Sequence, residues 1–310
     1  MYLVALIAVL SQMSSALPAA GVTGAPDDSL RAHIDARIAA VPGAMVGLAF
    51  HDLARGDTLY LAADERFHAA STMKMPVMIE LFRQVDRHQL SLARRVELRN
   101  EFKSIVDGSP YVLNASDDSD SLVYSWVGSS VTVHDLLEHM ITRSSNLATN
   151  TLIGLVGAAE ANATAHALGA RDIQVLRGVE DGKAFAAGMN NMTTARDLAT
   201  LMTSIETRAA ASRASTDSMR AILLRQEFND EIPAGLPPGT RVAHKTGQIT
   251  GHLHDAAIIY PQRRGPYVLV VLTRGIDDEK VARSLIADIS RLVYDHAVRG
   301  LETSAARDDR

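Results

Sequence analysis

Apolar residues recur at helical spacing near both ends of this chain. The segment 28–38 opens with Asp and Ser, which favour the first position of a helix, and continues with Leu, Ile and Ala at helical intervals. The segment 279–296 has one apolar face, made by Val281, Leu285, Ile286, Ile289, Leu292 and Val293. The pattern therefore predicts one helix at the start and one at the end.

Short segments rich in β-branched and other apolar residues indicate strands. They cover residues 44–53, 57–62, 241–246, 255–260 and 267–274. The first two flank the turn Ala54-Arg55-Gly56. Hairpin-length connections favour antiparallel pairing, so we expect strands from both ends of the chain to share one antiparallel sheet.

The middle of the chain is mostly helical in pattern. We predict helices with starts marked by Thr132, Ser145 and Thr193 or Thr194. The helices are expected at 75–82, 133–141, 146–156, 159–168, 195–205 and 216–226. The segment 171–191 has several glycines and no clear period, which is long for a structureless connection and suggests a functional loop.

This order predicts an α+β fold with two lobes: an antiparallel sheet flanked by the N- and C-terminal helices, and a mostly helical lobe beside it. We expect one domain over 28–300, with 28–70 and 228–300 in the α/β lobe and 71–227 in the helical lobe, followed by a polar tail at 301–310. A site is expected in the cleft between the lobes.

The N-terminus has the pattern of a secretory signal. Tyr2 to Leu10 is apolar, and small residues suited to cleavage follow at Ala16 and Ala20, so we expect a signal peptide at 1–20 and a linker at 21–27. Export would place the protein in the periplasm or outside the cell. No Lys or Arg precedes Arg31, which leaves a retained anchor or a buried helix as alternatives. The apolar run is shorter than the roughly 20 residues of a spanning helix, so no stable membrane insertion is expected.

Composition narrows the function further. The 310 residues carry a net charge of −5, with Lys and Arg scattered singly and only 5% aromatic residues, which argues against nucleic-acid binding. The absence of cysteine excludes disulfides and thiolate metal sites. We expect a monomer that acts on a small molecule without a cofactor.

Two polar clusters contain side chains of the kind that bind metal ions. Residues 114–121 would form an exposed loop whose acids match no calcium-loop spacing and face water. Those acids are Asp117, Asp118 and Asp120. His252 and His254 share one face of a strand, but no third ligand follows at a suitable spacing. We predict polar cleft lining or surface there, and no metal.

Ser71 and Lys74 stand where a strand-like segment passes into the helix predicted at 75–82. Ser71 would be the N-cap, and a separation of three residues places both side chains on one helix face. A serine attacks only when a neighbouring base accepts its proton, and a lysine can do so when burial and positive potential favour its neutral amine. These two residues alone would equally suit a cap followed by a solvated lysine.

Three further motifs follow Ser71-x-x-Lys74 in a fixed order. They are Ser144-Ser145-Asn146, Glu180 within the 171–191 loop, and Lys245-Thr246-Gly247 on a strand. This series resembles the class A β-lactamases and the wider penicillin-recognising serine hydrolases, over about residues 28–296. His244, next to Lys245, is expected to face away from it.

The resemblance implies a β-lactamase that works through an acyl-enzyme on Ser71. Lys74 would accept the serine proton, Ser144 would pass a proton to the leaving nitrogen, and Glu180 would activate water for deacylation. Asn146 would hold the substrate's side-chain amide. Lys245 and Thr246 would bind its carboxylate, Gly247 would allow close backbone approach, and the backbone N–H groups of Ser71 and Gln248 would form the oxyanion hole.

The chain also departs from the family pattern. Ala184 stands where the Glu180 loop usually has an asparagine that helps to hold water, and Asn190 and Asn191 stand where an acid usually pins the loop to an arginine. Ser145 replaces an aspartate that braces the turn in the family. No Arg follows Lys245 at the position that often assists carboxylate binding, so Arg274 or a histidine would substitute. An acylated sensor or binding module without turnover, and a D-Ala-D-Ala peptidase or esterase, remain the alternatives.

Overall fold

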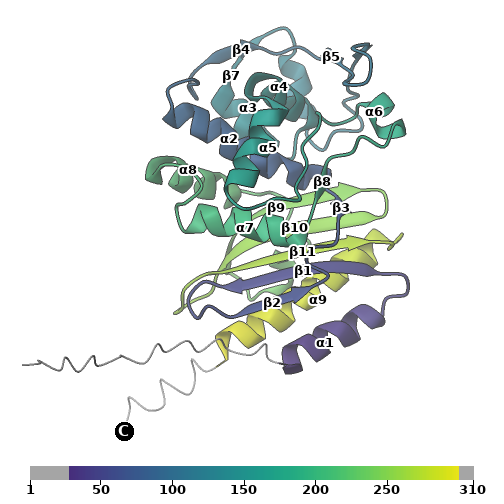
Figure 1. The fold of residues 1–310 in the computed structure, drawn as a ribbon, viewed down its shortest axis with the longest axis vertical. Helices are drawn as coiled ribbons and strands as arrows, with labels where there is room; N and C mark the ends of the chain where they lie inside the picture. The colour runs from purple at the N-terminus through teal and green to yellow at the C-terminus, as the bar shows by residue number, and fades with distance from the viewer. Residues whose placement is uncertain (1–27, 300–310) are drawn as a thin grey trace, which may run out of the picture.

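A five-stranded antiparallel sheet organises the computed structural model, which describes residues 28–299 (Figure 1). Its strand order is β2-β1-β11-β10-β9, so the predicted pairing of strands from both chain ends is confirmed. The strands are β1 (Met45–Asp52), β2 (Thr58–Leu61), β9 (Arg241–Ile249), β10 (His252–Tyr260) and β11 (Tyr267–Arg274). The expected signal peptide, linker and polar tail lie outside the described residues.

The terminal helices α1 (Asp28–Ala39) and α9 (Glu279–Val298) pack together on one face of this sheet (Figure 1). Their apolar residues meet alternate residues of the strands, because successive strand side chains point to opposite faces. Ile34, Leu285 and Ile289 are fully buried against Leu48 and Leu269. The predicted flanking helices are therefore confirmed.

The helical lobe lies beyond the opposite face of the sheet (Figure 1). Its helices are α2 (Lys74–Asp86), α3 (Val133–Thr142), α4 (Asn146–Val156), α5 (Ala158–Ala167), α7 (Ala195–Glu206) and α8 (Arg213–Leu223). Thr132, Ser145 and Thr194 cap their helices as predicted, each accepting a backbone N–H. Helix α8 begins three residues before the predicted start, because Ser212 caps it by accepting the Ser215 N–H.

One apolar core runs from the sheet into the helical lobe. Leu198 and Met202 of α7 are fully buried in the same cluster as Ala256, Ile258 and Val270 of the sheet. The two lobes are thus joined by packing as well as by the chain, which holds the cleft between them in a fixed shape. The lobe boundaries at residues 70 and 228 stay predictions.

Several short elements were not predicted, because each has too few residues to show a period. They are β3 (Phe67–His68), β4 (Arg95–Glu97), β5 (Phe102–Lys103), β6 (Pro110–Tyr111), β7 (Ser130–Thr132), β8 (Met192–Thr193), α6 (Gly182–Ala186), and the 3₁₀ helices η1 (Ala70–Met73), η2 (Ser121–Trp126) and η3 (Pro233–Gly235). The β3–β8 pair joins the segment before Ser71 to the end of the 171–191 loop. Among residues 28–299 no helix has the length and apolar character needed to span a membrane.

Candidate active site

A cleft of about 630 Å³ lies where η1, the start of α4 and the end of β9 meet. Its lining includes residues from three of the four predicted motifs: Ser71, Ser144, Asn146, Thr246, Gly247 and Gln248. Lys74 and Lys245 are fully buried and contact the Ser144 hydroxyl. Residues up to 177 positions apart in the chain are thus brought together, as the motif order predicted.

Ser71 lies inside the 3₁₀ helix η1, one turn before α2. The expectation that Ser71 is a helix cap is wrong, because the N-cap residues are Ala69 and Met73 and neither helix has a side-chain cap. None of the hydrogen bonds among residues 28–299 engages the Ser71 hydroxyl, so it is available to a substrate. Gly247 lies against this turn: a Cβ there would come within 3.3 Å of the Ser71 nitrogen.

The lysine of the first motif is fully buried beneath the cleft. The Lys74 Nζ donates to the Ser144 Oγ at 3.0 Å and to the Asn146 Oδ1 at 3.1 Å, and also to the Ser144 carbonyl. Burial, followed by the positive charge of Lys245, lowers the pKa of Lys74 well below its ordinary value, while the acids Asp118 and Glu180 oppose the shift. A neutral amine able to accept a proton is therefore favoured at this position.

The Ser144-Ser145-Asn146 turn places one hydroxyl between two lysines. The Ser144 Oγ accepts from Lys74 at 3.0 Å and from Lys245 at 3.1 Å. Ser144 itself has φ +60°, a left-handed conformation that a non-glycine residue adopts only when its surroundings hold it there. This geometry suits a hydroxyl that relays protons.

Glu180 reaches the same group of residues from the 171–191 loop. Its Oε1 accepts from the Asn146 Nδ2 at 2.7 Å, and its backbone is left-handed, with φ +61°. The residue is exposed and is not part of the cleft lining, yet partial desolvation of the carboxyl raises its pKa, with Asp118 and Asp117 adding to the shift while the Asn146 hydrogen bond and Lys74 oppose it. The raised pKa brings the carboxyl closer to the range of a general base.

Neutral amides close this loop in place of a carboxylate. The Arg177 guanidinium donates to the Met189 carbonyl at 2.9 Å and to the Asn190 Oδ1 at 3.2 Å. The Asn191 Oδ1 accepts the Leu176 N–H at 2.8 Å, and its Nδ2 donates to the Arg177 carbonyl at 3.0 Å. The loop is therefore closed at its base without the usual charged pair.

Asp181 is a structural residue that the sequence analysis missed. Its carboxylate caps α6 by accepting the Ala184 N–H at 3.1 Å, and accepts from Ser104 at 2.8 Å and from the Ile105 N–H at 2.9 Å. It thus anchors the loop beside Glu180. The signal was present in the sequence, since an aspartate before Gly182-Lys183-Ala184 is a favourable helix cap.

The side chains of Lys245 and His244 point to opposite sides of β9. The Lys245 Nζ points to Ser144, while the His244 ring is bonded to Asp255 at 3.0 Å on the other side, as predicted. Burial lowers the pKa of Lys245 to about 7, although the nearby acids Asp255 and Glu231 favour its charge. Burial, with Asp255, raises the pKa of Glu231 to about 7. Lys245 and Glu231 therefore both have pKa values shifted to about 7 at this end of the cleft.

Arg274, expected to replace the arginine that this chain lacks after Lys245, does not lie at the cleft. Arg274 donates to the Arg66 carbonyl at 2.9 Å and to Glu65 at 2.6 Å, because β11 lies two strands away from β9. Arg283 of α9 lines the cleft instead. It lies 3.2 Å from Glu279 and 3.5 Å from Glu231, so acids partly offset its charge.

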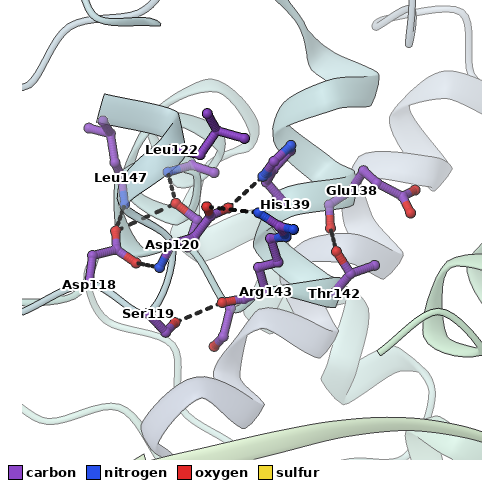
Figure 2. Close-up of polar contacts among 12 residues, drawn as sticks. Asp118, Ser119, Asp120, Leu122, Glu138, His139, Thr142, Arg143 and Leu147 are labelled. Carbon is purple, nitrogen blue, oxygen red and sulfur yellow. Dashed lines mark hydrogen bonds and ion pairs between the residues drawn. The ribbon is translucent and has the colours of Figure 1, made fainter. Parts of the chain in front are cut away.

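The acidic loop before η2 is not fully exposed, contrary to expectation. Asp117 is exposed, but the Asp118 and Asp120 side chains are buried against the helical lobe (Figure 2). The Asp118 Oδ2 accepts the Asn146 N–H at 2.8 Å, and Asp120 is bonded to the His139 ring. Burial of a carboxylate is tolerated because each has charged or N–H partners.

The two histidines of β10 lie on one face, as predicted, with ring centroids 6.0 Å apart. His254 is fully buried and bonded to the His68 carbonyl at 2.9 Å, and burial lowers its pKa to about 4. Both rings therefore belong to an aromatic cluster with His68, outside the cleft lining, and the prediction of cleft lining or surface is wrong for the buried His254. Over residues 28–299 no group of three His, Cys, Asp or Glu side chains is arranged to hold a metal ion.

A sequence profile of the beta-lactamase enzyme family matches residues 29–297 of this chain. The chain belongs to this family. The beta-lactamase AST-1 of Nocardia asteroides is 29% identical over 84% of this chain and 81% of its own. The beta-lactamase of Streptomyces albus G is 26% identical over 81% of this chain and 79% of its own.

Solved structures of this family have the same fold. PBP-A is 31% identical with a TM-score of 0.75, covering 88% of this chain and 97% of its own. The beta-lactamase from Sphaerobacter thermophilus is 30% identical with a TM-score of 0.75, over 87% and 97% of the two chains. The chain is therefore a serine enzyme of the class A β-lactamase type.

Proposed function

We propose that this enzyme hydrolyses β-lactams through an acyl-enzyme on Ser71. The observation that carries the proposal is the fully buried Lys74, held between Ser144 and Asn146 beneath a cleft that exposes the Ser71 hydroxyl. Burial and the neighbouring positive charge of Lys245 lower the pKa of Lys74, which favours transfer of the Ser71 proton to its amine.

In acylation, the Ser71 Oγ forms a bond to the lactam carbonyl carbon and gives its proton to Lys74. The lactam C–N bond breaks, and the nitrogen takes the proton of Ser144, which Lys74 replaces through the 3.0 Å contact between its Nζ and the Ser144 Oγ. The N–H groups of Ser71 and Gln248 would hold the oxyanion. Gly247 lies between them, because it packs against the Ser71 nitrogen and precedes Gln248 in β9.

Substrate recognition would use both walls of the cleft. Asn146 offers an amide to the substrate's acylamino group. Thr246, with Lys245 directly behind it, offers a hydroxyl and a positive charge to the carboxylate. Arg283 of α9 lies at the same end of the cleft, although two acids share its charge.

In deacylation, Glu180 would take a proton from water as the water oxygen attacks the ester carbon. The C–Oγ bond then breaks, and the Ser71 Oγ receives the proton that Glu180 took from water, which leaves Glu180 ionised again. Two observations support this role: Glu180 contacts Asn146, which also contacts Lys74, and the pKa of Glu180 is raised. The proposal includes export from the cytoplasm, which rests on residues 1–20.

The second candidate is a protein that is acylated and releases product slowly, such as a peptidase of this fold. Ala184 favours it, because no asparagine stands four residues after Glu180 to help hold water.

Glu180→Gln distinguishes the two candidates. We expect wild-type enzyme to turn over a chromogenic cephalosporin continuously, and Glu180→Gln to give one burst and a kcat lower by about 10²–10⁴-fold, the usual worth of a general base. The matched control is Glu97→Gln, which changes an exposed acid on β4. A single burst in the wild type would favour the second candidate, and the absence of any acylation would refute both.

A further inference from the structure

The Ser144-Ser145-Asn146 turn has no carboxylate of its own, although its conformation requires support. Ser144 is left-handed with φ +60°, and Asn146 is the first residue of α4. The first N–H groups of a helix lack partners within the helix. Ser145 is fully buried and satisfies only one of them, by accepting the Ala148 N–H at 3.3 Å.

Asp118, from a loop 28 residues earlier in the chain, supplies the missing acceptor. Its Oδ2 accepts the Asn146 N–H at 2.8 Å and the Leu147 N–H at 3.1 Å, and lies 3.5 Å from the Ser145 Oγ. The carboxylate therefore meets the positive end of α4, where a negative charge is stabilised and its hydrogen bonds are strengthened.

The Asp118 side chain is itself fixed by the segment that carries it (Figure 2). Its Oδ1 accepts the Asp120 N–H at 3.1 Å, and the Ser119 hydroxyl donates to the Arg143 carbonyl at 2.7 Å. Asp120 is bonded to the His139 ring on α3 and lies 3.7 Å from the Arg143 guanidinium. Residues 118–120 are thus attached to α3 on one side and to the start of α4 on the other.

We propose that Asp118 is the positioning residue of this site, and that it holds Ser144 and Asn146 against Lys74 from a separate loop. Lys74 contacts both residues, at 3.0 Å and 3.1 Å, so a shift of the turn would separate the base from the hydroxyl that relays its proton. The inference rests on the proposed function, because it assigns a role within that reaction.

The charge of Asp118 also acts on the groups that face it. These are Lys74 on α2, Glu180 on the 171–191 loop, Tyr124 on η2 and the adjacent Asp117. Asp118 raises the pKa of Lys74 and of Glu180, in each case beside larger effects of burial. Burial and then Asp118 raise the pKa of Tyr124, which keeps it neutral. Loss of the charge would therefore lower the pKa of Glu180.

The test compares wild type, Asp118→Asn, Asp117→Asn and the double variant Asp118→Asn/Ser145→Asp, which moves the carboxylate onto the turn. We expect Asp118→Asn to lower kcat by about 10–10²-fold, the scale of a misplaced catalytic group, and to move the acidic limb of the kcat profile to lower pH. Asp117→Asn removes a nearby charge without touching α4, so it should move the limb in the same direction and keep the plateau of kcat. The double variant should recover most of the lost kcat.

The results test the positioning role of Asp118 separately from the proposed function. Wild-type kcat in Asp118→Asn, or a folded double variant no more active than Asp118→Asn, would overturn the positioning role alone. Thermal unfolding identifies folded variants; if Asp118→Asn does not fold, the double variant must fold and turn over for the role to stand. A wild-type protein that is neither acylated nor active would overturn the proposed function, and this role with it.

Discussion

The residues proposed for acylation and the residue proposed for deacylation differ in burial and in the contacts that hold them. Lys74 and Lys245 are fully buried and converge on one hydroxyl, Ser144, and the N–H groups that follow it donate to Asp118 of a separate loop. Glu180 is exposed and stands on a loop that neutral amides close. Under the proposed mechanism, bond formation to Ser71 would therefore use the more buried residues, and release of the product would depend on the exposed Glu180.

The largest expected effect concerns the buried half. Lys74→Met keeps the length of the side chain and removes the amine, so the rate of acylation should fall by about 10²–10⁴-fold, measured by stopped-flow mixing with a chromogenic cephalosporin. Lys103→Met, at an exposed position of β5, is the matched control and should acylate at the wild-type rate. If Lys74→Met were acylated at the wild-type rate, Lys74 would not be the base for acylation.

The carboxylate-binding end should respond to pH near neutrality. Lys245 has a pKa lowered to about 7 and loses its positive charge as the pH rises through that value, while Glu231, with a pKa raised to about 7, becomes negative over the same range. Both changes weaken binding of an anion. We expect kcat/KM for a carboxylate-bearing β-lactam, divided by that for its methyl ester, to fall by about tenfold from pH 6 to pH 8.

Glu231→Gln tests this prediction further, because it removes the negative charge that Glu231 acquires above pH 7 and leaves Lys245 in place. The fall in the ratio should then be smaller. Titration of Lys74 and Glu180 affects kcat/KM for the acid and for the ester alike, so its effect cancels in the ratio. An identical pH dependence for acid and ester would show that Lys245 does not bind the carboxylate.

The smallest expected effect comes from strengthening the exposed half. Asn190→Asp gives Arg177 the charged partner that the loop lacks, at a contact that is now 3.2 Å long. We expect slower proteolysis within 171–191 and a deacylation rate a few-fold higher. Asn191→Asp is the contrasting control, because the Asn191 Nδ2 donates to the Arg177 carbonyl and a carboxylate cannot. Equal effects of the two changes would show that loop closure does not limit deacylation.

Periodic segments and helix caps were predictable from the sequence because their signals are local. Thr132, Ser145 and Thr194 cap the helices that follow them, and His244 faces away from Lys245 as alternation along a strand requires. The order of four short motifs then predicted which distant residues would meet, since a family resemblance carries spatial information that no single motif contains.

What the sequence could not predict depends on partners far along the chain. Asp118 and Asp120 look solvent-exposed in a polar segment, and only the fold brings Asn146, His139 and Arg143 to them. The placement of Arg274 failed for the same reason, because strand order decides which arginine reaches β9. Short elements such as η1 and α6 are set by tertiary contacts, and their few residues show no period.

The most direct test of the account is time-resolved intact-mass analysis of the wild-type protein mixed with excess benzylpenicillin. We predict an adduct with the mass of the whole penicillin, mapped to Ser71 by peptide digestion, that forms quickly and disappears once substrate is exhausted while penicilloate accumulates in many equivalents over enzyme. An adduct that persists after one equivalent, or an adduct on a residue other than Ser71, would contradict the proposed hydrolytic cycle.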